Sequence, residues 1–405
     1  MSQPASRSPS KPAKPLKDSD FRWEDPLDLE GELTEDERMV RDTARGYAQD
    51  KLMPRVLTAF RDERFDRGII SEMGELGLLG PTLPEEYGGA GADRLYSVVL
   101  MEEQTYAGTN GPGFAVHSDI IANYIYNFGN EAQRRHWLPK MASGEAIGAV
   151  AMTEPGTGSD LQAIRTRAQL DGDDYVINGS KIFITNGYLS DVVVVAVRTG
   201  DSGVGSQDIS LLLVESGRPG FTKAEPLKKV GLKAQDTCEL FFENVRVPRA
   251  NLLGAEGGGF RMLMHELGWE RLIIAILSIA GAQAALDCTL DYTRSRKVFG
   301  KAVADYQNSR FKLAEMKADI TVGQVFIDRC LELVLKNELT PEAAAVAKLY
   351  TSDLVCRVVD ECVQLHGGYG YMLEYPIARA FIDNRASRIY GGTNEIMKEL
   401  IARTL

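Results

Sequence analysis

Segments that resemble β-strands occur in only one part of this 405-residue chain, and this distribution limits its fold more than any other feature. Between about Ala149 and Pro248, short runs rich in β-branched residues are separated by Gly, Asn and Asp, which is typical of strands joined by turns. The chain before this region and the chain after it have the apolar spacing of helices. Because the strands cluster and do not alternate with helices, a doubly wound nucleotide-binding fold is not the first choice.

The chain is also longer than one hydrophobic core usually supports, since single cores stop growing at about 250–300 residues. We predict an α+β protein with a helical domain over 21–148, a β domain over 149–255 and a second helical domain over 256–405. The first 20 residues are rich in Ser, Pro and Lys, and we expect a disordered tail there. A helix is predicted to begin at Thr34, because Glu37 completes a capping box.

Charge and cysteine usage exclude several classes of protein. Acidic residues outnumber basic ones by 57 to 46, which disfavours nucleic-acid binding, although a local basic patch could still bind a small anion. Five cysteines form no CxxC pair and four histidines are scattered, so we expect a reducing compartment and no metal site. Without a secretory signal we expect the cytoplasm, with the mitochondrial matrix less favoured. No charge-free apolar run reaches the roughly 18 residues of a membrane span, and the longest candidate, 272–285, is expected to be a buried helix.

The segment MTEPGTGSD (152–160) has the composition of a ligand-binding loop. Its glycines allow backbone amides to approach a ligand, and Thr153 and Ser159 supply hydroxyl groups. Such a loop suits the polar edge of a flat cofactor or a phosphate. On composition alone, an ordinary Gly-rich turn is the simpler interpretation.

The segment KIFITNG (181–187) reads as a strand that ends in an Asn-Gly turn. Alternation would place Phe183 and Thr185 on one face and Ile182 and Ile184 on the other. An aromatic ring followed by a hydroxyl two residues later can stack on a ring system and hydrogen-bond to it. A half-buried strand without any ligand explains the same pattern.

One acidic residue interrupts the apolar face of a predicted helix over 260–277. Glu270 falls in the series Leu263, Leu267, Glu270, Ile274, Leu277, which shares one helix face. A carboxylate there loses hydration, so its pKa should rise toward a value suited to a general base. The alternative is a carboxylate that pairs with Arg271 or with a distant arginine.

Two further segments near the C-terminus, QLHGGYGY (364–371) and YGGTNE (390–395), combine glycine with aromatic residues and permit close approach to a planar ligand. Each motif is weak evidence of function by itself, but the occurrence of all of them in this order is strong evidence. From about Leu33 to Leu405 the chain resembles the acyl-CoA dehydrogenase family. The resemblance is carried by MTEPGTGSD (152–160), NGSKIFITNG (178–187), RKVFGKAV (296–303), QLHGGYGY (364–371) and IYGGTNEIMKELIAR (389–403).

The resemblance implies an N-terminal helical domain, a middle β-barrel and a C-terminal four-helix bundle, assembled as a homotetramer. It implies FAD between the β domain and the bundle, partly in a groove shared with a second subunit. The residues that would line the flavin or the thioester are Met152, Thr153, Gly158, Ser159, Phe183 (where many members have Trp) and Thr185. The residues that would reach the FAD of a neighbouring subunit are Arg296, Phe299, Gln307, Gln364, Gly367 and Gly368, while Thr393 and Glu395 would close the site.

The position of the catalytic base departs from one family pattern. Many members carry the glutamate directly after the tyrosine of the last motif, where this chain has Gly391. Members similar to the long-chain and isovaleryl enzymes place it on the helix that reads HELGWERLIIA here, so Glu270 matches the base and Arg271 the arginine after it. By the same resemblance, the Gly391 amide would stabilise the developing enolate. Ser159, Arg271, Tyr390 and Gly391 would contact the substrate.

The implied reaction is α,β-dehydrogenation of an acyl-CoA to a trans-2-enoyl-CoA, with electrons passed to an electron-transfer flavoprotein. Residues 152–403 look most like long-chain enzymes, which favours a medium- or long-chain substrate, with a short branched acyl-CoA as the alternative. Residues 21–42 and 71–82 look more like glutaryl-CoA dehydrogenases, but 95–133 contains no Lys or Arg for a distal carboxylate. An acyl-CoA oxidase is disfavoured because its extra C-terminal domain is missing. A non-catalytic acyl-CoA-binding or flavin-binding protein is disfavoured because the base is retained.

Overall fold

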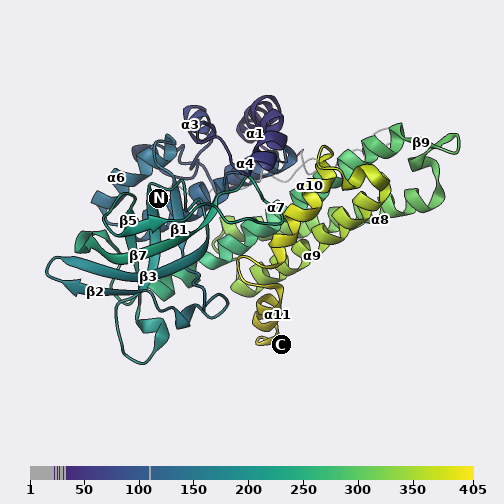
Figure 1. Cartoon of the computed structure of the whole chain (residues 1–405). Helices are drawn as coiled ribbons and strands as arrows, with labels where there is room; N and C mark the ends of the chain where they lie inside the picture. Colours follow the sequence, from purple (N-terminus) through teal and green to yellow (C-terminus); the bar gives the residue numbers. More distant parts are fainter. Residues whose placement is uncertain (1–21, 23–24, 26, 28–30, 32, 109–110) are drawn as a thin grey trace, which may run out of the picture.

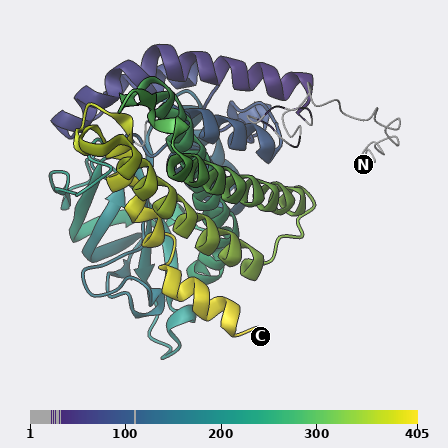
Figure 2. The same ribbon diagram turned by 90° about the vertical axis from the view of Figure 1, so that its right-hand side faces the viewer.

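The computed structural model describes residues 33–108 and 111–405, together with Arg22, Asp25, Leu27 and Gly31. The tail expected over 1–20 lies outside these residues. A β-sheet and a set of long helices lie side by side, and the N-terminal helices lie along one edge of both (Figures 1 and 2). The order along the chain is helices, then sheet, then helices, as predicted from the clustering of the strands.

The N-terminal helices are α1 (Glu35–Tyr47), α2 (Met53–Asp62), α3 (Gly68–Glu75), α4 (Arg94–Tyr106), α5 (Ala122–Phe128) and α6 (Glu131–Ala142). Helix α1 begins with the predicted capping box. The Thr34 hydroxyl accepts from the Glu37 amide at 3.3 Å, and the Glu37 carboxylate accepts from the Thr34 amide at 2.6 Å. A π-helical segment (Val116–Ile121) precedes α5, and the regular 3.6-residue period used for the sequence could not predict it.

The middle region forms an eight-stranded sheet in the order β6-β7-β3-β2-β4-β5-β8, with β1 paired to β4. Its strands are β1 (Gly148–Ala151), β2 (Arg167–Asp171), β3 (Asp174–Thr185), β4 (Val192–Arg198), β5 (Ile209–Glu215), β6 (Phe221–Lys223), β7 (Thr237–Pro248) and β8 (Leu252–Leu253). The expected barrel is present as a curved sheet: within the described residues its end strands β6 and β8 do not pair.

Strand β4 shows why this sheet has so long an apolar run. Val193 and Val195 point into a core formed by both halves of the sheet, whereas Val192 and Val194 face the other way and pack with α5 and α6. A strand buried on both faces is continuously hydrophobic and loses the polar alternation of a surface strand. The sheet is therefore fixed to the N-terminal helices by one face and filled by its own side chains on the other.

The C-terminal region contains α7 (Gly259–Ser295), α8 (Gln307–Leu335), α9 (Pro341–His366), α10 (Pro376–Asp383) and α11 (Asn394–Ala402). A hairpin, β9 (Lys297–Val298) and β10 (Lys301–Ala302), joins α7 to α8. The expected four-helix bundle consists of three long helices and the short α10, which packs on α7 and α9. By length and composition α7 could cross a membrane, and 72 % of its apolar window is buried in this fold.

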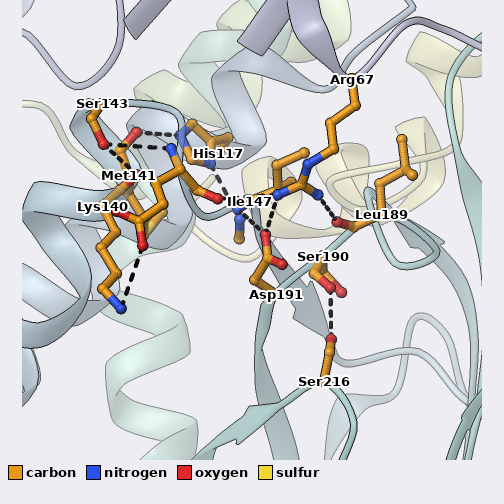
Figure 3. A network of polar contacts seen from close by, with 12 residues as sticks. Arg67, His117, Lys140, Met141, Ser143, Ile147, Leu189, Ser190, Asp191 and Ser216 are labelled. Atoms are coloured by element: carbon orange, nitrogen blue, oxygen red, sulfur yellow. Dashed lines mark hydrogen bonds and ion pairs between the residues drawn. The ribbon is translucent and has the colours of Figure 1, made fainter. Parts of the chain in front are cut away.

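A polar network ties the N-terminal helices to the sheet (Figure 3). Arg67 donates to Asp191 at 2.7 Å and to the Leu189 carbonyl at 2.8 Å, and Asp191 also accepts from the Ile147 amide. His117 is buried between the Met141 carbonyl and the Gly148 amide, so its Nε2 carries the proton. Burial lowers the pKa of His117 to about 4, so the ring stays neutral at physiological pH.

Candidate active site

Helix α7 places Glu270 at the junction of the bundle with the N-terminal helices. The side chain is buried, and its Oε1 accepts a hydrogen bond from the Tyr124 hydroxyl of α5 at 3.0 Å. Burial raises the pKa of Glu270 to about 7, although the Tyr124 hydrogen bond opposes the rise. A carboxyl group with this pKa exchanges a proton readily near neutral pH, which suits a general base.

The alternative interpretation of Glu270 was an ion pair with an arginine. Within the described residues Glu270 forms no ion pair, and its hydrogen-bond partner is Tyr124. Arg271 is also buried, its Nε has no hydrogen-bond partner, and burial lowers its pKa. Glu270 and Arg271 influence each other's pKa through their charges without forming an ion pair. The Arg271 Nε therefore remains a free donor for another group.

Tyr124→Phe should move the pH dependence of proton abstraction. The hydroxyl stabilises the charged carboxylate, so its loss raises the pKa of Glu270 further above about 7. Because the base must be deprotonated to act, we expect the rise in rate to shift upward by about one pH unit. The measurement is the pH profile of anaerobic flavin reduction by an acyl-CoA. Tyr126→Phe, on the same helix, should leave the profile in place, and an unshifted profile in Tyr124→Phe would contradict the role of this hydrogen bond.

Gly391 begins a tight loop that faces the helix of the base. Its φ is 66° and that of Gly392 is 90°, a backbone conformation that L-residues rarely adopt. An ideal Cβ at Gly391 would lie only 2.2 Å from the Cδ1 atom of Ile274, one turn after Glu270. A side chain at position 391 would have to displace the end of the Ile274 side chain and adopt a strained backbone, so glycine suits this position.

A buried lysine of α9 holds this loop by two hydrogen bonds. Lys348 of α9 is fully buried, and its Nζ donates to the Gly392 carbonyl at 2.9 Å and to the Asn394 side-chain oxygen at 2.7 Å. Burial lowers the pKa of Lys348 to about 8. Thr393 caps α11 by accepting from the Ile396 amide at 3.3 Å, and Glu395 lies exposed in the first turn. The loop is thus fixed where it enters α11.

Lys348→Met should destabilise the protein markedly. The substitution leaves the Gly392 carbonyl and the Asn394 oxygen buried without this donor, so we expect the free energy of unfolding to fall by about 2–4 kcal/mol. Urea denaturation measures the change. Lys336→Met, at an exposed position after α8, is the control and should stay within about 0.5 kcal/mol of the parent. Equal stability of the two variants would show that Lys348 does not hold the loop.

Met152, in the segment 152–160 after strand β1, packs against the apolar cluster that contains Tyr124 and Leu263. Lys181, fully buried, donates to the Met152 carbonyl at 2.9 Å and to Glu154 at 2.8 Å. Glu154 in turn accepts from two backbone amides of the following loop. The predicted ligand-facing residues Met152 and Thr153 are half-buried, whereas Gly158 and Ser159 are exposed. Lys181 and Glu154 thus hold the buried side of this loop by hydrogen bonds, and its outer side is exposed.

Strict alternation over 181–185 is wrong. The pairing of β3 with β7 shifts between Lys181 and Ile184, and Phe183 has a positive φ of 61°. This bulge places two residues between the buried Lys181 and Ile184 where a regular strand has one. As a result Phe183 is 64 % exposed, and Thr185 is half-buried beside the bulge.

The remaining predicted cofactor residues lie elsewhere in the chain. Six of them are exposed around the β9–β10 hairpin, the start of α8 and the end of α9: Arg296, Phe299, Gln307, Gln364, Gly367 and Gly368. The hairpin is at the end of the bundle that points away from the sheet (Figure 1). One chain therefore does not bring these residues to Phe183 and Glu270. Tyr390, predicted to contact the substrate, lies next to Gly391 and is 43 % exposed.

Comparison with known proteins identifies the family to which this fold and site belong. Models of the N-terminal, middle and C-terminal domains of acyl-CoA dehydrogenase match residues 34–145, 149–245 and 257–405. The chain belongs to the acyl-CoA dehydrogenase family. The mitochondrial long-chain specific acyl-CoA dehydrogenase of Sus scrofa is 50 % identical over 368 residues, which cover 91 % of this chain and 86 % of that protein.

Solved structures agree with this assignment. The acyl-CoA dehydrogenase of Geobacillus kaustophilus matches with a TM-score of 0.90 and 44 % identity, covering 92 % of this chain and 98 % of that one. A glutaryl-CoA dehydrogenase of Mycobacterium smegmatis in complex with FADH2 matches with a TM-score of 0.88 and 32 % identity, covering 95 % and 98 %. This acyl-CoA dehydrogenase is thus an FAD-dependent oxidoreductase that acts on CH–CH bonds.

The residues present fit a flavin. Phe183 is held exposed by a strained backbone at the bulge, which offers an aromatic face to a flat ring. A Cβ at Gly156, Gly158, Gly367 or Gly368 would meet no atom within 4 Å, so these backbone segments are open to a ligand. The exposed Arg296 has the charge and donors to hold a diphosphate.

Sequence reasoning missed the residues that support the site. Tyr124 carries no local pattern that connects it to a helix about 150 residues later. Lys348 does carry one, because a lone lysine in the segment AAAVAKLY interrupts an apolar helix as Glu270 does. Glu266 lies one turn before Glu270 and is also buried, which the same spacing argument would have found.

Proposed function

We propose that this acyl-CoA dehydrogenase oxidises a medium- or long-chain acyl-CoA to the trans-2-enoyl-CoA, with Glu270 as the base that takes the α-proton. The observation that carries the proposal is a buried carboxyl group, its pKa raised to about 7 by burial, one helical turn before Ile274, which packs against the Gly391 loop. Bound FAD would supply the acceptor for the β-hydride. The Gly391 amide would stabilise the negative charge that develops on the thioester oxygen.

Several neighbours support this division of roles. Lys348 fixes the carbonyl of Gly392, two peptide units after the Gly391 amide, and so restrains the loop that carries this amide. The unpartnered Nε of Arg271 is available to a polar group of the ligand. Met152, Thr153 and Ser159 would line the thioester from the side of the sheet.

The chain-length assignment has weaker but consistent support. The likeness to the long-chain enzyme of Sus scrofa favours a long acyl chain. Arg94 lies directly before the cation-free stretch 95–133 and could in principle meet a second substrate carboxylate. Its guanidinium lies over the Trp269 ring at 4.3 Å, and its buried Nη1 has no hydrogen-bond partner within the described residues. The likeness to the long-chain enzyme, and not the surroundings of Arg94, is what disfavours a dicarboxylyl substrate.

A homotetramer and transfer of electrons to an electron-transfer flavoprotein belong to the same proposal. The predicted cofactor residues at the far end of the bundle can contact FAD only if a second copy of the chain binds its FAD against them. Exposed apolar side chains on this end support such an assembly, among them Phe299 at 98 % and Phe311 at 56 % exposure. Sedimentation equilibrium of the purified holoenzyme tests the tetramer, and a monomer at micromolar concentration would contradict it.

Anaerobic titration of the yellow holoenzyme with acyl-CoAs tests the reaction and the substrate. The series runs from butyryl-CoA to palmitoyl-CoA, with isovaleryl-CoA and glutaryl-CoA as comparisons. We expect bleaching of the flavin absorbance to be fastest with the longer straight chains. No bleaching with any thioester would contradict the proposed function. Rapid reoxidation by air in the presence of product would favour an oxidase over transfer to a protein acceptor.

A further inference from the structure

A buried base must return its proton to water once in each catalytic cycle, and the surroundings of Glu270 limit the direction. Toward the C-terminus of α7 the next residues on the same side are Ile273, Ile274 and Leu277, which carry no titratable group. Toward the N-terminus of α7 the next turn carries Glu266, which is only 2 % exposed. On this helix, a polar path from the base therefore leads toward Glu266.

Glu266 connects the interior to the surface. Its Oε1 accepts from Asn127 Nδ2 at 2.8 Å and shares a 3.0 Å hydrogen bond with His265 Nδ1, in which the donor depends on the tautomer of the ring. Its other oxygen has no hydrogen-bond partner within the described residues. The His265 side chain is 66 % exposed, and its ring lies edge-on to Phe128 at 5.6 Å. A buried carboxylate and a solvent-exposed imidazole thus share one hydrogen bond.

Two side chains of α5 donate hydrogen bonds to the carboxylates of Glu270 and Glu266. Tyr124 donates to Glu270, and Asn127, one turn later, donates to Glu266. Burial raises the pKa of Tyr124, and the charges of Glu270 and Glu266 raise it further. The other charged groups that act on the pair are Arg94 of α4, which faces Glu266, and Arg271, which acts on Glu270.

We propose that Glu266 and His265 carry the proton from Glu270 to solvent. The inference rests on the proposed function, because Glu270 gains a proton only if it abstracts one. Protonated Glu270 passes a proton to the Glu266 carboxylate, through the Tyr124 hydroxyl or one bridging water, and becomes a carboxylate again. The Nε2–H tautomer of His265 takes the Glu266 proton at Nδ1, and the imidazolium then releases its Nε2 proton to water. No electrons move in these steps. The Nδ1–H tautomer that remains exchanges with solvent through the exposed ring, which frees Nδ1 for the next cycle.

The test separates proton release from proton abstraction. A 3-thiaacyl-CoA has sulfur in place of the β-carbon and cannot give a hydride, so only its α-protons react. Bound to the holoenzyme in D2O, it reports by NMR how fast a proton on Glu270 is replaced from solvent. Anaerobic flavin reduction in a single turnover with an ordinary acyl-CoA reports the abstraction itself, which needs no proton release.

We expect Glu266→Gln and His265→Gln to slow the α-proton exchange by about 10²-fold. We expect them to slow first-turnover flavin reduction far less, and added imidazole to restore exchange in His265→Ala. Glu266→Gln keeps an acceptor for Asn127, which preserves the packing. His136→Gln is the matched control, because His136 is also exposed and lies edge-on to an aromatic ring, Trp137, at 4.7 Å.

Three results would overturn the proposal. Exchange at the parent rate in both Glu266→Gln and His265→Gln would show that the proton leaves another way. An equal loss of exchange and of first-turnover reduction would show that Glu266 acts on the base itself. An equal loss in His136→Gln would show that the effect is not specific to this path. If the parent enzyme neither exchanges nor reduces its flavin with any thioester, the proposed function fails instead.

Discussion

Glu270→Gln should reduce the rate of flavin reduction by about 10³–10⁴-fold, the largest effect expected from any single substitution in this chain. The amide has nearly the same shape as the carboxyl group and can still accept from Tyr124. It cannot take up a proton at any pH at which the protein is folded. The α-proton of a thioester is too weakly acidic to leave without a base, so both the proton and the hydride stay on the substrate.

Stopped-flow absorbance under anaerobic conditions measures this loss. The FAD content and the thermal midpoint of the variant should match those of the parent, because the substitution removes a buried group of pKa about 7 and adds no volume. Glu315→Gln, at an exposed position on α8, is the control and should reduce its flavin at the parent rate. Full activity in Glu270→Gln would show that another residue is the base.

Gly391→Ala should also abolish most activity, by about 10²–10³-fold, and for a geometric reason. The new methyl group would lie 2.2 Å from Ile274 Cδ1, and the φ of 66° is unfavourable for alanine. Rotation of the Ile274 side chain does not relieve the strain at this φ, so we expect the loop to shift, and with it the amide proposed to face the thioester oxygen. A donor displaced by even about 1 Å loses much of its effect on the transition state.

A second substitution makes this explanation testable. Ile274→Ala removes the side chain that the new methyl group strikes, so the double variant should recover part of the lost flavin reduction, while the unfavourable φ remains. The coupling between the two positions is measured as a double-mutant cycle on the rate of anaerobic reduction. Strictly additive effects would mean that the contact with Ile274 does not position the loop.

Part of this architecture follows from local sequence. The capping box at Thr34 and Glu37 was predictable because both partners lie within one helical turn. Glu270 was predictable because a carboxylate at apolar helix spacing is conspicuous. The clustering of strands gave the order of the domains for the same reason: each element carries its own period.

The parts that could not be predicted depend on contacts between distant segments. Tyr124 meets Glu270 only after α5 packs against α7, and no spacing in the sequence records that contact. The bulge in β3 breaks the period of two on which the placement of Phe183 rested, and its cause lies in the pairing with β7 and in the loop that Lys181 supports. The site of a fold with three domains is assembled from such contacts, which is why the supporting residues were missed.

The position of Glu270 within α7 has a consequence for motion. This 37-residue helix packs on α4, α8, α9 and α10, so its central turns lie in the core of the molecule. We expect the backbone amides around Glu270 to exchange with deuterium only through global unfolding, on a timescale far longer than a catalytic cycle. Glu270 should therefore keep its position in the fold during a catalytic cycle. Any movement that admits the acyl chain should therefore come from the segments around α7 and not from this helix.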